Sequence, residues 1–227
     1  MLNWQNDNEL FAAMRVDLYT AVVGDIMDTM GLCHQFLPAY IRPLLDDMVI
    51  VGRAMTVQEC DIEKLPADSP VKDKPFGVMF EALDSLKENE VYICSGSSHN
   101  YALAGELMAT RASFLGAAGF VVDGFVRDTL GLLKMGMPVF SAGSYAQDQG
   151  VRGKVTAYQV PISMGKVTIR PGDIIFGDID GVLVIPREHE QEIIQKAYEK
   201  VKGENLVADA IRAGMPTVEA FATFGIM

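Results

Sequence analysis

Basic residues are scarce in this sequence. It has 19 Lys and Arg against 30 Asp and Glu, which gives a formal net charge of −11 at pH 7. Proteins that bind nucleic acid need a basic surface that neutralises phosphates, so we expect no nucleic-acid partner. A small anionic substrate is not excluded, because it responds to the local charge of a site rather than to the total.

Cysteines and long apolar runs are also few. The three cysteines, Cys33, Cys60 and Cys94, have neither close pairing nor metal-type spacing. We expect three buried thiols in a reducing cytosol. No apolar run approaches the roughly 18 residues that a membrane helix needs, and the N-terminal MLNWQNDNEL is too polar and acidic for a secretory signal. The sequence therefore predicts a cytoplasmic protein without a membrane partner.

The chain is long enough for a sizeable core. It has 227 residues, of which 49% are hydrophobic and 22% charged, as in ordinary globular proteins. We see no internal repeat, low-complexity segment or clean linker. We therefore expect one domain over residues 1–227, with a core over about 20–186 and a C-terminal helical extension over 187–227.

Hydrophobic periodicity predicts alternating helices and strands. Helices are expected over 8–14, 20–30, 76–86, 129–135, from 187 to a stop at Gly203, and over 205–213. Strands are expected over 48–58, 90–95, 119–123, 138–142, 155–161, 166–169, 173–176 and 182–186. Thr20 is the expected N-cap of the second helix, Gly31 its stop, and Gly52-Arg53 an expected bulge. The segment 61–75 is rich in Pro, Lys and Asp, and reads as a surface loop or a lid over a site.

The order of these elements predicts a mixed, layered α/β fold. The strand–helix rhythm from 91 to 142 favours parallel strands with right-handed crossovers. Beyond it, the turns Met164-Gly165, Pro171-Gly172 and Asp180-Gly181 are typical of antiparallel hairpins. A parallel portion should therefore be followed by an antiparallel one.

The stretch from Gly105 to Asp128, GELMATRASFLGAAGFVVDGFVRD, is the best candidate site. A helix of about 12 residues travels roughly 18 Å, and a five-residue strand returns nearly the same distance. Glu106, which opens the helix, and the Arg127-Asp128 pair should therefore meet at one edge of the sheet. Ligands of open α/β sheets bind outside the carboxyl ends of the strands.

Each of these residues also has an ordinary structural explanation. An acid in the first turn of a helix is favoured by the helix dipole, and an Arg-Asp neighbour pair is commonly a surface ion pair. Together they suggest more, because free N–H groups at a helix start bind carboxylates and an arginine can stabilise an enolate. Two carboxylates can hold a hard divalent cation, partly through water. His99, in the preceding loop, either lines this site or is incidental.

Several motifs give the chain a family resemblance. In order, GELMATRA, GFVVDGFVRDT, MPVF, PGD and GDIDGVLVIP resemble the RraA-like family over about residues 20–186. That family includes class II pyruvate aldolases acting on 4-hydroxy-4-methyl-2-oxoglutarate and 4-carboxy-4-hydroxy-2-oxoadipate. The resemblance implies a three-layer α/β/β domain of the swivelling β/β/α type, with a mixed sheet and N- and C-terminal helices. It also implies a homotrimer or homohexamer with sites at subunit interfaces.

The resemblance implies a role for each site residue. Asp128 matches the ligand of Mg²⁺ or Mn²⁺, and Glu106 matches an acid that holds metal-bound water. Arg127 matches the catalytic arginine that contacts the pyruvyl oxygens and stabilises the enolate. Backbone amides that bind the pyruvate carboxylate match four successive residues: Gly105, Glu106, Leu107 and Met108. The implied reaction cleaves a 4-hydroxy-2-oxo acid to pyruvate, and the same chemistry would decarboxylate oxaloacetate.

The chain departs from the aldolase pattern in two places. Glu106 stands where those enzymes more often have Asp, and the loop SGSSHN at 95–100 is a variant. In the aldolases a further acid from a neighbouring subunit completes the site. The alternative is an RraA-type regulator that binds and inhibits a ribonuclease, a branch in which the residue after the arginine is not an acid. Asp128 favours the enzyme.

Overall fold

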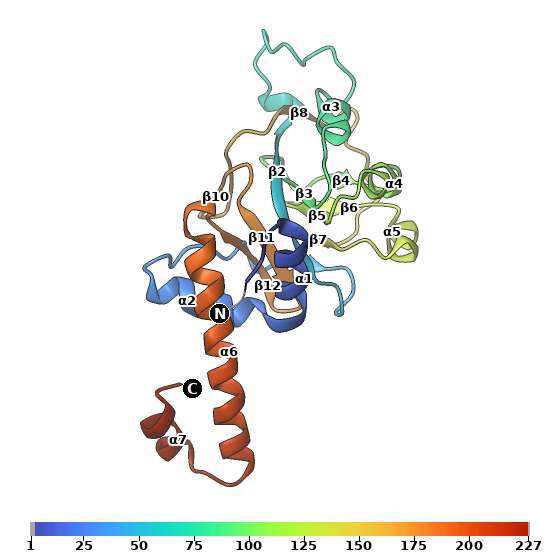
Figure 1. The fold of residues 1–227 in the computed structure, drawn as a ribbon. Coiled ribbons are helices and arrows are strands. Elements are labelled where there is room, and N and C mark those ends of the chain that lie inside the picture. Colours follow the sequence, from blue (N-terminus) through green and yellow to red (C-terminus); the bar gives the residue numbers. More distant parts are fainter. Residues whose placement is uncertain (1–2, 227) are drawn as a thin grey trace.

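The computed structural model describes residues 3–226 and is built around one mixed sheet (Figure 1). Within these residues eight strands form the sheet, seven of them in the order β1-β7-β5-β3-β2-β11-β12, while β8 pairs with β2. Their bounds are β1 Arg42–Pro43, β2 Ile50–Asp61, β3 Glu90–Ser95, β5 Gly119–Val122, β7 Val139–Ser141, β8 Gly153–Tyr158, β11 Ile174–Asp178 and β12 Gly181–Ile185.

Four neighbouring strands of the sheet are parallel and the strands that follow them in the chain pair antiparallel, which confirms the expected order; the short edge strand β1 is also antiparallel to β7. β2, β3, β5 and β7 run parallel. Short helices make the crossovers between them: α3 Met79–Asp84, α4 Glu106–Phe114 and α5 Thr129–Met135. β8 and β11 lie antiparallel to β2, and β11 and β12 form a hairpin.

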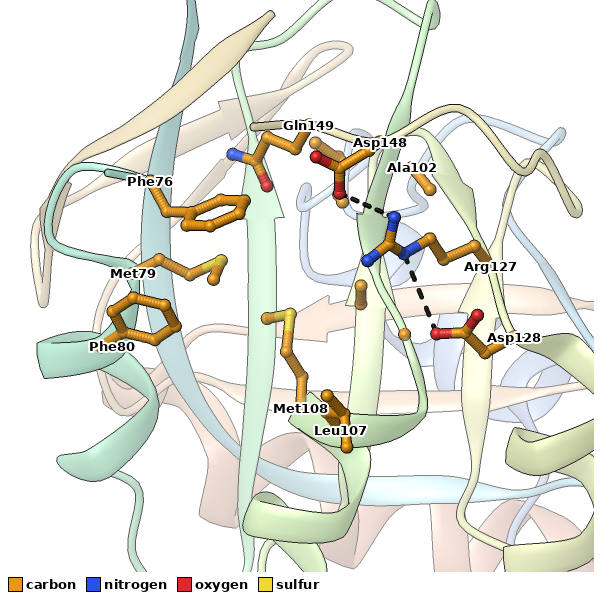
Figure 2. Close-up of a pocket in the computed structure, with 13 residues that line it drawn as sticks. Phe76, Met79, Phe80, Ala102, Leu107, Met108, Arg127, Asp128, Asp148 and Gln149 are labelled. Atoms are coloured by element: carbon orange, nitrogen blue, oxygen red, sulfur yellow. Dashed lines mark ion pairs between the residues drawn. The ribbon is translucent and has the colours of Figure 1, made fainter. Parts of the chain in front are cut away.

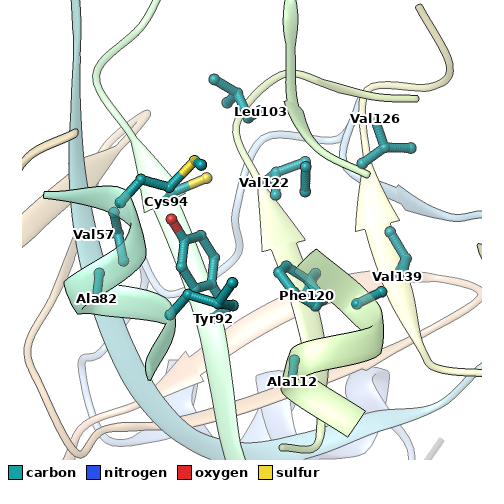
Figure 3. Packing of buried hydrophobic residues seen from close by; sticks show 14 of the residues in the cluster. Val57, Ala82, Tyr92, Cys94, Leu103, Ala112, Phe120, Val122, Val126 and Val139 are labelled. Atoms are coloured by element: carbon teal, nitrogen blue, oxygen red, sulfur yellow. The ribbon is translucent and has the colours of Figure 1, made fainter. Parts of the chain in front are cut away.

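Both faces of this sheet are buried, so its strands read as continuous apolar runs. On β3, Tyr92 and Cys94 join the core beneath α3, α4 and α5 (Figure 3), whereas Val91 and Ile93 join the core on the opposite face. The hairpin of β9 Ile162–Met164 and β10 Val167–Ile169 covers part of that opposite face. Helices, large sheet and small sheet thus give the expected α/β/β layers.

Terminal helices cover the β11–β12 end of the sheet (Figure 1). They are α1 Asp7–Asp17, α2 Thr20–Thr29 and α6 Glu190–Arg212, and the first two turns of α6 bury Ile193 and Ile194. α6 then continues away from the sheet to α7 Thr217–Phe224, which folds back near its far end. The predicted C-terminal extension ends at residue 227, which lies outside the described residues.

Two glycines that were predicted to interrupt an element lie inside one instead. α6 does not stop at Gly203 but runs through it, and a Cβ there would overlap Ile226. The bulge of β2 lies between Gln58 and Glu59 rather than at Gly52, where a Cβ would overlap the carbonyl oxygen of Asn89. Both glycines are therefore explained by a close neighbour in space.

The start of α2 also differs from the prediction. Tyr19, not Thr20, is the N-cap, and both the N–H and the hydroxyl of Thr20 donate 2.7 Å hydrogen bonds to the Asp178 carboxylate. The stop at Gly31 is confirmed, with a left-handed φ of 78°. The helix predicted from residue 76 begins at Met79, because Phe76 and Gly77 both have positive φ.

The cysteines differ from the prediction in their exposure. All three thiols are free, but only Cys94 is buried; Cys60 is half-buried and Cys33 is exposed, so the expectation of three buried thiols was wrong. Among residues 3–226 the structure contains no helix with the length and apolar character required to span a bilayer.

Candidate active site

A separate two-stranded sheet, formed by β4 Ala102–Ala104 and β6 Phe125–Val126, positions the site. β4 pairs in parallel with β6, and the Arg127 N–H donates a 2.9 Å hydrogen bond to the Ala104 carbonyl. β4 leads into α4 through Gly105, and β6 leads into α5 through Arg127 and Asp128. The pair is too short to show a sequence pattern, and it is the element that brings the two halves of the predicted site together.

Gly105 lets the two segments approach closely. It is the N-cap of α4, and a Cβ at this position would lie 2.6 Å from Oδ2 of Asp128 and 3.2 Å from Cγ of Arg127. Its φ of −153° is open to any residue, so the glycine is required by space rather than by conformation. Because Gly105 has no side chain, the Asp128 carboxylate can approach the start of α4 closely.

Asp128 sits at the N-terminus of α4 and at the N-cap of α5. Its Oδ2 accepts a 3.3 Å hydrogen bond from the backbone N–H of Glu106. Its backbone is left-handed, with φ of 55°, a conformation that costs roughly 1 kcal/mol or more in a residue other than glycine. The first-turn N–H groups of Leu107 and Met108 have no acceptor within the helix, so they are available to a ligand.

Arg127 lies between two carboxylates (Figure 2). Its Nη1 is 2.7 Å from Oδ1 of Asp148, and its Nε is 3.8 Å from Oδ2 of Asp128. The side chain is 40% exposed, so it is held in place and still reaches solvent. Asp148 lies in the loop before β8, where no sequence pattern marked it as part of the site.

The side chain of Glu106 faces α5. A Cβ at Gly131, in α5, would overlap the Glu106 carboxyl, so that carboxyl lies directly against the α5 backbone. Glu106 does not line the pocket beside Arg127, whereas Gly105, Leu107 and Met108 do. The Glu106 side chain thus lies outside the pocket lining, although its backbone N–H contacts Asp128, and its role at a metal stays a prediction.

The pocket itself has a volume of about 230 Å³. One wall carries Arg127, Asp128 and Asp148, and the facing wall carries apolar side chains (Figure 2): Phe76, Met79, Phe80, Leu107 and Met108. Predicting this wall from sequence was not possible, because Phe76 to Phe80 arrive from a different crossover.

Gln149 lines the pocket next to Asp148 and is anchored from the core. Its Nε2 donates a 2.7 Å hydrogen bond to Oε2 of Glu59, whose side chain is fully buried in β2. Burial raises the pKa of Glu59 to about 8. The other carboxyl oxygen of Glu59 and the hydroxyl of Tyr92 are buried without a hydrogen-bond partner in the described part of the chain.

His99 lies outside the pocket lining. Its Nε2 is 3.1 Å from Oδ1 of Asp123, and its ring packs edge-on against Tyr40 and Phe125. These contacts account for the histidine as part of an aromatic cluster at the end of β5, rather than as a residue of the pocket.

The donor set suits a hard divalent cation. Within residues 3–226 no three His, Cys, Asp or Glu side chains cluster as metal ligands. Asp128 and Glu106 are nonetheless both exposed at the start of α4, and Mg²⁺ is commonly held by one or two carboxylates with water as the remaining ligands. The Asp128 carboxylate can occupy this position because Gly105 has no Cβ there.

The mixed sheet with helical crossovers makes this an α/β protein. Its half-exposed arginine beside helix N-terminal amides is an arrangement that can hold a small oxygen-rich anion. The family to which the chain belongs is the RraA-like family, whose model, described as Aldolase/RraA, matches residues 20–184. The resemblance seen in the sequence is confirmed.

Known relatives agree with this assignment. A protein of Halalkalibacterium halodurans named "Putative 4-hydroxy-4-methyl-2-oxoglutarate aldolase" is 33% identical over 202 residues, which cover 89% of each chain. A crystal structure described as novel cellulases from microbes associated with the gut ecosystem has 32% identity and a TM-score of 0.79, covering 90% of this chain and 89% of that one. Streptomyces coelicolor RraAS2, described as an unusual member of an RNase ES inhibitor family, shares the fold at 22% identity, with a TM-score of 0.75 over 90% of this chain and 98% of its own.

Proposed function

We propose that this protein is a divalent-metal-dependent lyase that cleaves a 4-hydroxy-2-oxo acid and releases pyruvate. One observation carries the proposal: Arg127 and Asp128 meet the N-terminus of α4 at the wall of a pocket. Relatives named as aldolases support the lyase class. Decarboxylation of oxaloacetate, which passes through the same enolate, is the expected side activity.

The N-terminus of α4 binds the substrate carboxylate. The Glu106 N–H is taken by Asp128, which leaves the N–H groups of Leu107 and Met108 for the ligand. Both residues line the pocket, and a helix N-terminus favours a negative charge. This anchor places the 2-keto group beside Arg127.

Arg127 then acts on the charge that develops during the reaction. The C3–C4 bond breaks, the C4 hydroxyl proton passes to water as C4 becomes a carbonyl, and the electron pair of the broken bond forms the enolate of pyruvate. The guanidinium is already fixed by Asp148, so it stabilises the enolate oxygen without reorganising. Protonation at C3 completes the release of pyruvate.

Asp128 would hold the cation, and Glu106 would hold water beside it. A Mg²⁺ or Mn²⁺ ion bound there supplies Lewis-acid polarisation of the 2-keto oxygen. Asp128 keeps its orientation through the Glu106 N–H, so binding needs no movement of the backbone. The homotrimer or homohexamer implied by the family resemblance belongs to this proposal, with a neighbouring copy contributing a further acid.

Two other functions are less well supported. An RraA-type ribonuclease regulator needs no acid after the arginine, and the structural likeness to RraAS2 at 22% identity shows the fold alone. Glycoside hydrolysis requires a carboxylic acid and a second carboxylate flanking the scissile bond. Here both carboxylates that line the pocket, Asp128 and Asp148, contact Arg127 instead.

A coupled lactate dehydrogenase assay tests the proposal. Oxaloacetate and a panel of 4-hydroxy-2-oxo acids should release pyruvate with Mg²⁺ or Mn²⁺, and EDTA or Asp128→Asn should abolish it. Asp84→Asn is the matched control, because Asp84 pairs with Arg111 on the surface, away from the pocket. Activity that survives both EDTA and Asp128→Asn would remove the metal assignment, and a panel without any turnover would remove the enzyme assignment.

A further inference from the structure

The two walls of the pocket differ in chemistry, and this difference bears on the substrate. The anchor for a pyruvyl group lies at one side, formed by the α4 N-terminus, Arg127 and Asp128. A substrate bound there directs its C4 group across the pocket. The facing wall therefore contacts whatever C4 carries.

That facing wall is apolar. Phe76 and Phe80 pack edge-on with ring centroids 5.7 Å apart, and Met79 is 6% exposed beside them (Figure 2). Leu107 and Met108 extend the surface from the first turn of α4. Methionine and aromatic side chains favour apolar groups and offer no donor for a carboxylate.

The cations around the pocket are already paired, so they also offer no partner for a second carboxylate. Of the thirteen described residues that line it, Arg127 is the one cation, and Asp148 and Asp128 both contact it. Lys74 and Arg152, on segments that adjoin the lining residues, are both engaged. Lys74 pairs with Glu81 at 3.6 Å, and Arg152 donates a 2.9 Å hydrogen bond to the Asp148 carbonyl.

We infer, on the basis of the proposed function, that the substrate carries an apolar group at C4 rather than a second carboxylate. A carboxylate placed against the Phe76–Met79–Phe80 wall would lose water without gaining a cation, which is costly. An alkyl or aryl group would bury apolar area there. The substrate class is a 4-hydroxy-2-oxo acid that yields pyruvate and an aliphatic or aromatic aldehyde or ketone.

Unreactive ligands test this class without turnover. Calorimetry with Mg²⁺ present compares pyruvate, 4-methyl-2-oxopentanoate and 2-oxoglutarate, which share one 2-oxo acid head. The extra carbons of 4-methyl-2-oxopentanoate should tighten binding about tenfold or more over pyruvate, at roughly fourfold per buried methylene. 2-Oxoglutarate should bind no more tightly than pyruvate.

A positive charge introduced on the apolar wall provides the matched variant. Phe80 is 52% exposed, so Phe80→Lys can fold, and it should weaken 4-methyl-2-oxopentanoate and tighten 2-oxoglutarate, each by about tenfold. Leu107→Lys, at an 85% exposed side chain, should shift the preference the same way if Phe80→Lys does not fold. Phe114→Lys is the control, because Phe114 is exposed on α4 and does not line the pocket.

The outcomes separate the inference from the proposed function. If pyruvate binds and 2-oxoglutarate binds more tightly than 4-methyl-2-oxopentanoate, the apolar substrate class is wrong while the pyruvyl site stands. If none of the three ligands binds, the pyruvyl site is wrong and the inference falls with it. A preference that Phe80→Lys and Leu107→Lys leave unchanged would also overturn the inference, since another surface would then be responsible.

Discussion

Glu59→Gln should stabilise the folded protein, and increasingly so as the pH rises. Glu59 is buried in β2, its Oε2 accepts the Gln149 hydrogen bond, and burial raises its pKa from 4.5 to about 8. Glutamine has the same shape and keeps a carbonyl that accepts this hydrogen bond. The substitution therefore removes an ionisable group while retaining its contact.

The sign and size follow from proton linkage. Between pH 4.5 and 8 the folded protein holds the Glu59 proton and the unfolded chain does not, so the stability that this residue contributes falls as the pH rises. The slope is about 1.4 kcal/mol per pH unit within this window. From pH 5.5 to 7.5 the free energy of unfolding of Glu59→Gln should therefore gain about 3 kcal/mol relative to the wild type.

Urea denaturation at pH 5.5, 6.5 and 7.5 measures this difference. Glu63→Gln is the matched control, because Glu63 is an exposed glutamate just after β2 and lacks the burial to which the effect at Glu59 is attributed. If the unfolding free energies of Glu59→Gln and the wild type run parallel over this range, Glu59 is ionised in the folded protein. The account of Glu59 as a carboxyl that burial keeps protonated would then be refuted.

Two further changes test the geometry around Arg127. Gly105→Ala places a methyl group 2.6 Å from the Asp128 carboxylate, so kcat/KM should fall more than about tenfold. Circular dichroism should show an intact fold. An unchanged kcat/KM would contradict the argument that Gly105 makes room for Asp128. Asp148→Asn removes the 2.7 Å charged partner of Arg127 and should raise KM about tenfold in steady-state assays, since the guanidinium loses its fixed position. An unaltered KM would show that Asp148 does not orient Arg127.

The local pattern of the sequence was sufficient for most regular elements. The apolar run of β3, Glu90–Ser95, and the short helix α5, Thr129–Met135, lie where the pattern placed them. Both have clear boundaries, in a turn at Asn89 and a left-handed glycine at Gly136. The mixed sheet followed from the order of such elements and their turns.

Other features depend on neighbours that are distant in sequence. Gly203 was expected to end a helix, yet it lies inside α6, at a position where a side chain would overlap Ile226. β4 and β6 are three and two residues long, which is too short for hydrophobic periodicity to predict them. They pair with each other and with the segment 143–147, which are contacts that sequence periodicity does not show.

The candidate site divides in the same way. Glu106, Arg127 and Asp128 were predictable because one motif contains them and chain geometry brings its ends together. Asp148 and Gln149 come from a loop with no motif, and only the ion pair to Arg127 and the buried Glu59 place them in the pocket. The orientation of Glu106 toward Gly131 also depends on how α4 and α5 pack, which the sequence does not show.

Exchange of the pyruvate methyl protons with deuterium tests the central claim most directly, because it needs only the enolate and not the C4 group. In D₂O with Mg²⁺, the methyl signal of pyruvate followed by NMR should decay with the wild-type protein and persist with EDTA or with Asp128→Asn. Arg127→Lys, which loses the planar fork, should slow the exchange by about a hundredfold. Exchange that survives both EDTA and Asp128→Asn, or a wild-type protein that causes none, would contradict an enolate site at Arg127 and Asp128.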